Sequence, residues 1–452
     1  MQIYKLYSLC YNVSMTNIVL SNLFIKIFIA GTLISFAINH LLEFIDMRAR
    51  IKNSGKLPEE LNGIAEAAVF DTEKLAKISA YENAKYFFWI PRSICSLALT
   101  LILVFSGYYP WLFNMTCRLT GSPSDLFSSY FCALIFFICA GIPASILSVP
   151  FDLISEFNIE KKFGFSNMTI KMWISDQLKG LALSTVLAAI LIFAMILVLV
   201  KFPGSWWVLL VCVMFALTLV LQVIYPLVIA PMFNKFTPLE DGELKERISA
   251  LMKNLGFKSS GIFVMDASKR SGHSNAYFGG LGKSKRIVLY DTLIKQLTTD
   301  ELVAVLGHEL GHYKMHHITR KMCIMLPLEL VIMYILFRIA HGTSIYTGFG
   351  FEIADVPVES IQFIGLFLAS LVAESLSEIL SPVVNSSSRH DEYQADAFSA
   401  KLTGSPDALI SGLIKLNSEN LNELLPPKLY VIWNYNHPTL VERIKALKTS
   451  KK

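Results

Sequence analysis

Two histidines and a glutamate in His308-Glu309-x-x-His312 are spaced for metal chemistry. In a helix, His308 and His312 project from one face, so both can bind one metal ion. Glu309 lies beside them, where it can take a proton from a water molecule. Thr298 and Glu301 form a capping box that predicts where this helix begins. The pattern is typical of zinc proteases and predicts one Zn²⁺ per chain; the alternative is a surface helix carrying two scattered histidines.

A catalytic zinc needs a third protein ligand. Ile318 stands where the metzincin pattern requires a histidine, so that class is excluded. A glutamate on a second helix is the other solution. Glu392 fits, because Asp396 shares its face four residues later and can accept the free ring N–H of a ligand histidine. Glu374 and Glu378 are alternative third ligands.

Other histidines surround the motif in the sequence. His437 lies at the start of a predicted helix that begins at Asn436 or His437, with Pro438 in its first turn. It can donate a hydrogen bond to a tetrahedral oxyanion, with Arg443 supporting it; a histidine without special role is the alternative. His316 and His317 are expected on faces turned away from the metal, as polar residues at the membrane interface.

A short sheet is expected between a turn-rich linker at 233–242 and the motif helix. Glu243 to Leu255 is predicted to be an amphipathic helix, and 261–266 and 286–290 are predicted strands. Between them, Asn275-Ala276-Tyr277 can hold a peptide substrate by strand addition, backbone to backbone. An ordinary edge strand is the alternative.

The composition is that of a membrane protein. Of 452 residues, 54% are hydrophobic and 17% charged, against about 25% charged in soluble domains. The net charge of +5 comes without a dense basic patch, so nucleic-acid binding is not expected. The seven cysteines form no Cys-x-x-Cys pair and are expected to be buried, small and apolar. No cleaved signal peptide is expected.

Seven segments have the length that a bilayer demands. They are Ile27–Phe44, Ile94–Phe113, Tyr130–Pro150, Leu178–Phe202, Trp206–Pro231, Met322–Ala340 and Ser360–Leu380. Lysine and arginine gather in the odd-numbered loops, which predicts a lumenal N-terminus and a cytosolic C-terminus. The long polar segments after the fifth and seventh spans then share the cytosolic side.

Acidic and amide residues inside or near these spans indicate a hydrated chamber or helix contacts. They are Gln222, Glu329, Glu359, Glu374, Glu378, Asp152 and Glu156. Asn12 and Asn114 begin glycosylation triplets on the predicted outer side. Four segments result: 1–231 with five membrane helices, 232–321 with the metal motif, 322–381 with two membrane helices, and 382–452 with the third ligand.

Five ordered blocks resemble the type I CAAX prenyl proteases, membrane zinc endopeptidases that process prenylated proteins. The blocks are Ala230–Leu239, Arg270–Phe278, His308–His312, Ser388–Ala397 and His437–Arg443. The resemblance covers nearly the whole chain. A weaker match at Ile159–Phe165 has Phe163 where the family usually has histidine, so that loop is assigned no catalytic role.

The resemblance implies a mainly α integral membrane protein. Seven transmembrane helices would enclose a chamber, with a gluzincin-like protease domain of helices and a small β-sheet on the cytosolic side. It implies zinc on His308, His312 and Glu392, with Glu309 as general base and Asp396 supporting the ligands or proton transfer. His437 and Arg443 would stabilise the transition state, and the strand through Asn275 would hold the substrate.

The expected reaction removes the last three residues from prenylated CAAX proteins or peptides. The expected location is the endoplasmic reticulum membrane, with the inner nuclear membrane as a further site, and the lipid bilayer as partner. Two other functions remain open at this point. One is a membrane quality-control metalloprotease that does not require prenylation, and the other a seven-helix receptor or transporter with a chance motif.

Overall fold

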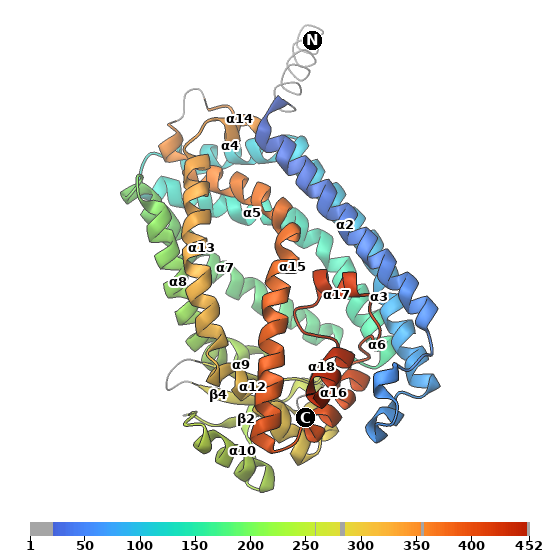
Figure 1. Cartoon of the computed structure of the whole chain (residues 1–452). Coiled ribbons are helices and arrows are strands. Elements are labelled where there is room, and N and C mark those ends of the chain that lie inside the picture. Colours follow the sequence, from blue (N-terminus) through green and yellow to red (C-terminus); the bar gives the residue numbers. More distant parts are fainter. Residues whose placement is uncertain (1–20, 258, 281–284, 354–356, 450–452) are drawn as a thin grey trace.

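Seven long helices dominate the computed structural model, which describes residues 21–257, 259–280, 285–353 and 357–449 (Figure 1). They are α2 (Leu23–Asn53), α3 (Thr72–Phe105), α5 (Leu126–Ile154) with its continuation to Phe163, α7 (Ile170–Lys201), α8 (Trp206–Ile224) with its continuation to Phe233, α13 (His317–Ala340) and α15 (Gln362–Thr403). Each is long and apolar enough to cross a membrane. Every predicted span overlaps one of them. The triplet at Asn12 lies outside the described residues.

The second predicted span, Ile94–Phe113, is wrong at its end. Helix α3 stops at Phe105, and a separate helix, α4 (Tyr108–Thr120), follows. Gly107 between them has φ +76°, a conformation that glycine adopts without strain. Hydropathy alone missed the break because α4 continues the apolar run. Asn114 consequently lies within α4.

The membrane helices converge at the end of the molecule opposite the sheet (Figure 1). There α4 and α14 (Ser344–Gly348) lie against α2, α5 and α15. Phe136 and Phe363 are fully buried at this end, and Phe136 packs edge-on against Phe367 with ring centroids 5.2 Å apart. Aromatic pairs of this geometry add to the stabilisation that burial itself provides.

At the other end lies a four-stranded sheet of order β1-β2-β4-β3. The strands are β1 (Phe236–Pro238), β2 (Ile262–Met265), β3 (Ala276–Gly279) and β4 (Arg286–Tyr290). Strand β2 runs parallel to β4. Strand β1 pairs antiparallel with β2, and β3 pairs antiparallel with β4. The predictions for 261–266 and 286–290 are confirmed. The linker at 233–242, predicted to be turn-rich, also contains β1.

The remaining elements are shorter helices and helical turns. They are α6 (Lys161–Phe163), α9 (Ala230–Phe233), α10 (Glu243–Asn254), α11 (Asp291–Gln296), α12 (Thr299–Lys314), α16 (Asp407–Glu419), α17 (Lys428–Asn434), α18 (Leu440–Thr449), the 3₁₀ turns η1 (Glu59–Leu61), η2 (Ala65–Val69), η5 (Ala267–Lys269) and η7 (Val358–Ser360), and the π-helical turns η3 (Ser155–Glu160) and η4 (Tyr225–Ile229). Helix α10 confirms the predicted amphipathic helix.

The predicted start of the last helix is wrong by three or four residues. Helix α18 begins at Leu440, not at Asn436 or His437. The Thr439 hydroxyl accepts the N–H of Glu442, whose carboxylate accepts the N–H of Thr439. This capping box overrides the signal of Pro438, and it leaves His437 in the loop before the helix.

Two cavities open between the helices. One of about 780 Å³ is lined by α2, α3, α16 and α17 and reaches Asn275, His437 and Arg443. The other, of about 400 Å³, lies among α2, α3, α5 and α15. Of the polar residues that indicated a chamber, Glu374 lines the second cavity. Glu43, Glu82 and Glu423 line the first.

Candidate metal and substrate site

Helix α12 is positioned at its start by the capping box that the sequence predicts. Thr298 accepts the N–H of Glu301, and the Glu301 carboxylate accepts the N–H of Thr298 at 2.8 Å. The same carboxylate accepts the Ser411 hydroxyl and lies 2.7 Å from the Lys415 ammonium, both on α16. These bonds fix the rotation of α12 and therefore the direction of the motif.

Two glycines bring α12 close to α15. A Cβ at Gly311 would lie 3.1 Å from Cα of Ala395, and one at Gly307 would lie 3.0 Å from Oγ of Ser399. Ser399 also donates to the Ala304 carbonyl at 2.6 Å. A larger side chain at Gly311 would meet backbone, which cannot move aside, and would push the helices apart.

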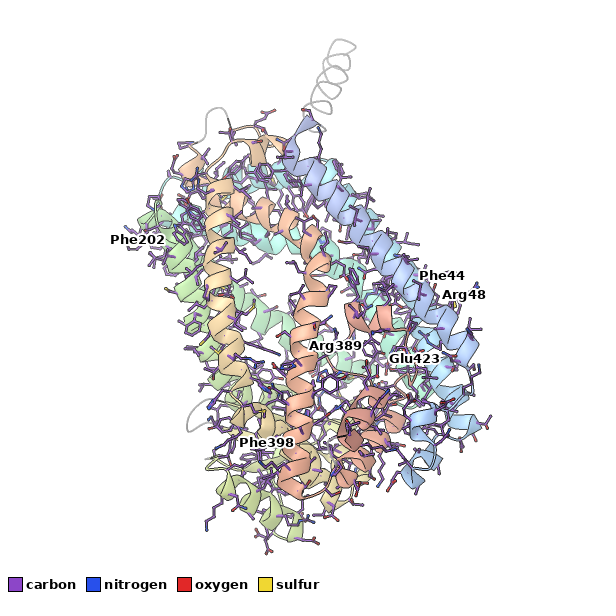
Figure 2. All side chains as sticks on the ribbon, in the orientation of Figure 1. Phe44, Arg48, Phe202, Arg389, Phe398 and Glu423 are labelled. Carbon is purple, nitrogen blue, oxygen red and sulfur yellow. The ribbon has the colours of Figure 1, made fainter. Side chains whose placement is uncertain are left out.

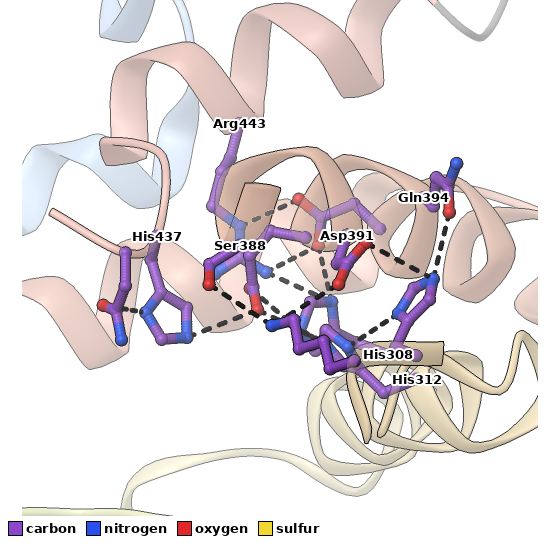
Figure 3. A network of polar contacts seen from close by, with 12 residues as sticks. His308, His312, Ser388, Asp391, Gln394, His437 and Arg443 are labelled. Atoms are coloured by element: carbon purple, nitrogen blue, oxygen red, sulfur yellow. Dashed lines mark hydrogen bonds and ion pairs between the residues drawn. The ribbon is translucent and has the colours of Figure 1, made fainter. Parts of the chain in front are cut away.

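Three side chains with atoms suited to bind a metal ion converge between these two helices, and Figure 3 labels two of them, His308 and His312. One ligand atom each from His308, His312 and Glu392 lies within 4.8 Å of the other two. The Nε2 atoms of the histidines are 3.2 Å apart, and the Glu392 oxygens lie 3.2 and 3.3 Å from them. Oε2 of Glu392 is buried; besides the His308 ring nitrogen 3.3 Å away, no hydrogen-bond donor reaches it among the described residues. A buried carboxylate whose two oxygens each face an imidazole nitrogen fits a bound cation.

Asp396 contacts the ring nitrogen of His308 that faces away from His312 and Glu392, and Arg443 in turn holds Asp396. Nδ1 of His308 lies 2.8 Å from Oδ1 of Asp396, so Nδ1 donates and leaves Nε2 for the metal. Arg443 donates to both Asp396 oxygens, with Nε 2.8 Å from Oδ2. Burial, the largest influence, lowers the pKa of His308, but hydrogen bonds with Asp396 and Glu392 outweigh it and raise the pKa to about 9.

Glu309 faces a small pocket of about 120 Å³ beside the three ligands. Asn275, Ala276, His437 and Arg443 also line this pocket. Burial raises the pKa of the Glu309 carboxyl. A carboxyl with a raised pKa at a metal-binding cluster is suited to exchange protons with a reacting water.

His437 reaches the same pocket from the loop between α17 and α18. Its Nε2 lies 3.4 Å from Oε1 of Glu392, and 58% of its side chain faces open space. Protein atoms around the His437 ring partly desolvate it, which lowers its pKa. Arg389, labelled beside α15 in Figure 2, donates to the Val431 and Tyr435 carbonyls at 3.1 and 2.6 Å. Arg389 thereby fixes the end of α17 and the loop that carries His437.

The expectation that His317 faces away from the metal is wrong. His317 is buried, and its Nδ1 lies 3.0 Å from Nδ1 of His312. His316, at φ +57°, turns the chain between α12 and α13 so that His317 returns over the motif. Gln394 holds the other ring nitrogen of His317 at 3.0 Å. The sequence prediction extends the helix past Lys314, and an extended helix would not contain the turn at His316.

The predicted substrate segment forms the edge of the sheet. Strand β3 pairs on one side with β4 and ends the strand order. The Tyr290 N–H donates to the Asn275 carbonyl, so Ala276 presents its backbone groups at the free edge. The Asn275 side chain accepts the Ala276 N–H at 2.8 Å. Asn275 and Ala276 line the metal pocket, while Tyr277 follows them along the strand.

The alternative third ligands lie elsewhere on α15. Glu374 lines the 400 Å³ cavity among the membrane helices. Glu378 lies one turn further along, where its carbonyl accepts the Trp433 indole N–H at 3.2 Å. Within the described part of the chain, the metal-binding cluster contains Glu392 and neither of these residues.

Comparison with known proteins covers nearly the whole chain. Residues 47–235 match the model of the CAAX prenyl protease N-terminal region with five membrane helices, and residues 238–451 match peptidase family M48. CAAX prenyl protease 1 homolog from Arabidopsis thaliana is 38% identical, covering 86% of this chain and 90% of that protein. CAAX prenyl protease 1 from Saccharomyces cerevisiae is 36% identical, covering 83% and 86%.

The homolog from Homo sapiens is 31% identical, and the alignment covers 94% of this chain and 96% of that protein. The fold is also similar to a solved structure. The crystal structure of Ste24p from S. mikatae matches with a TM-score of 0.83 at 34% identity, covering 93% of this chain and 98% of that one. Sequence blocks, membrane helices and the converging ligands therefore agree. The chain is a multi-pass membrane metallopeptidase and belongs to peptidase family M48, in its CAAX prenyl protease 1 branch.

Proposed function

We propose that this chain is a zinc endopeptidase that removes the last three residues from prenylated CAAX proteins. The observation that carries the proposal is the convergence of His308, His312 and Glu392 at a pocket that also holds Glu309 and the free edge of β3. The relatives named above are CAAX prenyl protease 1 proteins, which supports this substrate class. The receptor or transporter reading is not favoured, because the chain belongs to a peptidase family.

The three ligands fit zinc, which prefers imidazole nitrogen and carboxylate oxygen in catalytic sites. When bound, zinc supplies Lewis-acid polarisation of the scissile carbonyl and makes a water molecule more acidic. Glu309 takes a proton from the attacking water and delivers it to the leaving amine. His437 donates to the developing oxyanion, and Arg443 acts through Asp396 to hold His308 in the binding tautomer.

The substrate adds as a strand at the free edge of β3. Asn275 releases the N–H of Ala276 to the substrate backbone, and Tyr277 continues the strand. Backbone pairing holds peptides with little regard to their side chains. The prenyl group then supplies affinity from the membrane side.

We assign the metal site to the cytosolic side of the endoplasmic reticulum membrane, with a lumenal N-terminus and the inner nuclear membrane as a further location. The lysine and arginine distribution supports this orientation. The proposed segments are 1–231, 232–321, 322–381 and 382–452. The last boundary marks a change of environment rather than a break, because α15 continues from Gln362 to Thr403.

Peptide cleavage by the purified protein tests the proposal. A farnesylated CAAX peptide is expected to lose its last three residues, as measured by mass spectrometry. A chelator is expected to stop cleavage, and added zinc to restore it. Glu309→Gln is expected to keep stoichiometric zinc while cleavage falls by at least about a thousandfold, the scale of catalytic-group deletions.

The unprenylated form of the same peptide is the control. Equal kcat/KM for the two forms would favour a quality-control protease that does not require prenylation. Zinc-dependent cleavage at other bonds would refute the proposed three-residue removal. Retained activity in Glu309→Gln would remove Glu309 as the base.

A further inference from the structure

The segment directly before the substrate strand is clamped by a distant loop. Residues 165–167 run beside residues 268–272 and join them through backbone bonds. The Gly272 N–H donates to the Phe165 carbonyl at 2.7 Å, and the Asn167 N–H donates to the Arg270 carbonyl at 3.0 Å. A Cβ at Gly272 would lie 3.2 Å from the Gly164 carbonyl oxygen, so glycine permits this close approach.

His273 is the centre of this clamp. Its ring stacks on Phe165 with centroids 3.9 Å apart and 14° between the planes. Nε2 lies 3.3 Å from Oε2 of Glu160, in the π-helical turn that continues α5. Nδ1 lies 3.2 Å from Oδ1 of Asn420, just after α16. Three surfaces of one ring are therefore held by segments far apart in the sequence.

The partners of His273 are themselves fixed. The Tyr81 hydroxyl of α3 donates to Oε1 of Glu160 at 2.8 Å, which leaves Oε2 for His273. Oδ1 of Asn420 also faces the Ser274 N–H at 3.3 Å, so the amide oxygen is oriented toward this segment. The His273 carbonyl accepts the Thr292 hydroxyl at 3.0 Å. Little freedom remains two residues before Asn275.

We infer that His273 is a positioning residue for the reaction. By holding His273, Glu160 and Asn420 fix the distance between the β3 edge and the proposed metal ligands. Asn275 and Ala276 line the metal pocket, so a shift of this segment moves the groups that pair with substrate. The loop at 159–165 thus has no catalytic side chain but aligns the substrate. This inference rests on the proposed strand addition.

Steady-state kinetics on the full-length enzyme with the farnesylated CAAX peptide tests it. His273→Ala and Glu160→Ala are each expected to raise KM about tenfold, with kcat within about threefold and zinc content unchanged. The lost bond is internal and charge-assisted, and its loss lets the β3 edge shift, which weakens the binding of substrate and transition state alike. The double variant is expected to raise KM no further than His273→Ala alone, because His273→Ala already removes the interaction with Glu160. Lys269→Ala, an exposed change in the same segment, is the matched control.

Conservative variants keep the test decisive if the alanine variants fold poorly. Glutamine at position 273 places an amide nitrogen near the position of the His273 Nε2, and asparagine places one near the position of Nδ1. His273→Gln and His273→Asn are therefore each expected to have a KM between those of His273→Ala and the wild type. A protein that merely folds less well would show a lower apparent kcat at unchanged KM, and that result would overturn the inference. Loss of zinc in His273→Ala would overturn it as well.

The affinity of a fluorescent farnesylated peptide for Glu309→Gln separates this inference from the proposed function. Adding His273→Ala to that background is expected to weaken binding about tenfold. Unchanged affinity refutes the positioning role while cleavage by the wild type still stands. Failure of the wild type to cleave the farnesylated peptide refutes the substrate class, and the same KM comparison then proceeds with the unprenylated peptide.

Discussion

At the residue scale, Asp396 decides how His308 can bind a metal. Its carboxylate accepts from Nδ1 at 2.8 Å and is neutralised by Arg443. Asp396→Asn replaces a charged acceptor by a neutral amide, and we expect zinc affinity to fall by about 10- to 100-fold. Competition with a calibrated chelator measures this. Asp241→Asn, at an exposed aspartate before α10, is the control; equal affinities in the two variants would contradict the supporting role.

The proton on His308 gives metal binding a defined pH dependence. In the metal-free protein, hydrogen bonds to Asp396 and Glu392 overcome burial and raise the pKa of His308 to about 9. Zinc binds the neutral ring, so below pH 9 it must displace this proton. From this proton alone, apparent affinity is expected to rise about tenfold per pH unit between pH 6 and 8 and to level off near pH 9.

Calorimetry in buffers of different ionisation enthalpy measures the released proton. The expected result at pH 7 is at least one proton released per zinc. Affinity that falls as pH rises through this range would contradict the assignment of His308 as a ligand.

At the scale of elements, α12 depends on its capping box. Thr298→Ala removes the side chain that accepts the Glu301 N–H. We expect a loss of about 1 kcal/mol in the free energy of unfolding, the usual value for such a cap. Thermal unfolding in detergent measures it, and Thr299→Ala, one position later, is the matched control. Equal Tm values for the two variants would show that packing against α15 and α16 alone determines the helix.

Local signals explain which elements the sequence predicts well. The capping box at Thr298, the strand at 286–290 and the apolar centre of α7 are each encoded within a few residues. The β1 strand depends on its pairing with β2 further along the chain, and the break at Gly107 falls inside an apolar run that hydropathy does not divide. Helix α18 shows a further limit, because the Thr439 box competes with the nearby proline signal and only one can begin the helix.

Some residues of the candidate metal site can likewise be predicted from local sequence, and others cannot. The spacing of His308, Glu309 and His312 follows from one helix, and sequence alone predicts it. Choosing Glu392 over Glu374 requires the crossing of α12 and α15, which no periodicity reveals; the family resemblance supplied that choice. His317 escaped prediction because one left-handed residue, His316, redirects the chain. The clamp at His273 joins segments more than a hundred residues apart.

At the scale of the whole molecule, the metal ligands join two halves of the peptidase region. His308 and His312 belong to α12, whereas Glu392 belongs to α15, and two membrane helices, α13 and the first part of α15, separate them in the chain. Because α12 packs against the last part of α15, an ion shared by the two helices stabilises the folded arrangement over any opened one. The proposed zinc is therefore a structural link as well as a catalyst.

Chelation should consequently lower the stability of the whole protein. At a free zinc concentration one hundred times Kd, binding contributes about 2.7 kcal/mol, so removing the metal is expected to lower Tm by several degrees and adding it back to restore Tm. Glu392→Ala should lose this response, whereas Glu374→Ala should keep it. Glu309→Gln should also keep it, because Glu309 is not a ligand in the proposed site. A zinc-dependent Tm that survives in Glu392→Ala but vanishes in Glu374→Ala would place the third ligand inside the membrane region, and the site between α12 and α15 would have to be abandoned.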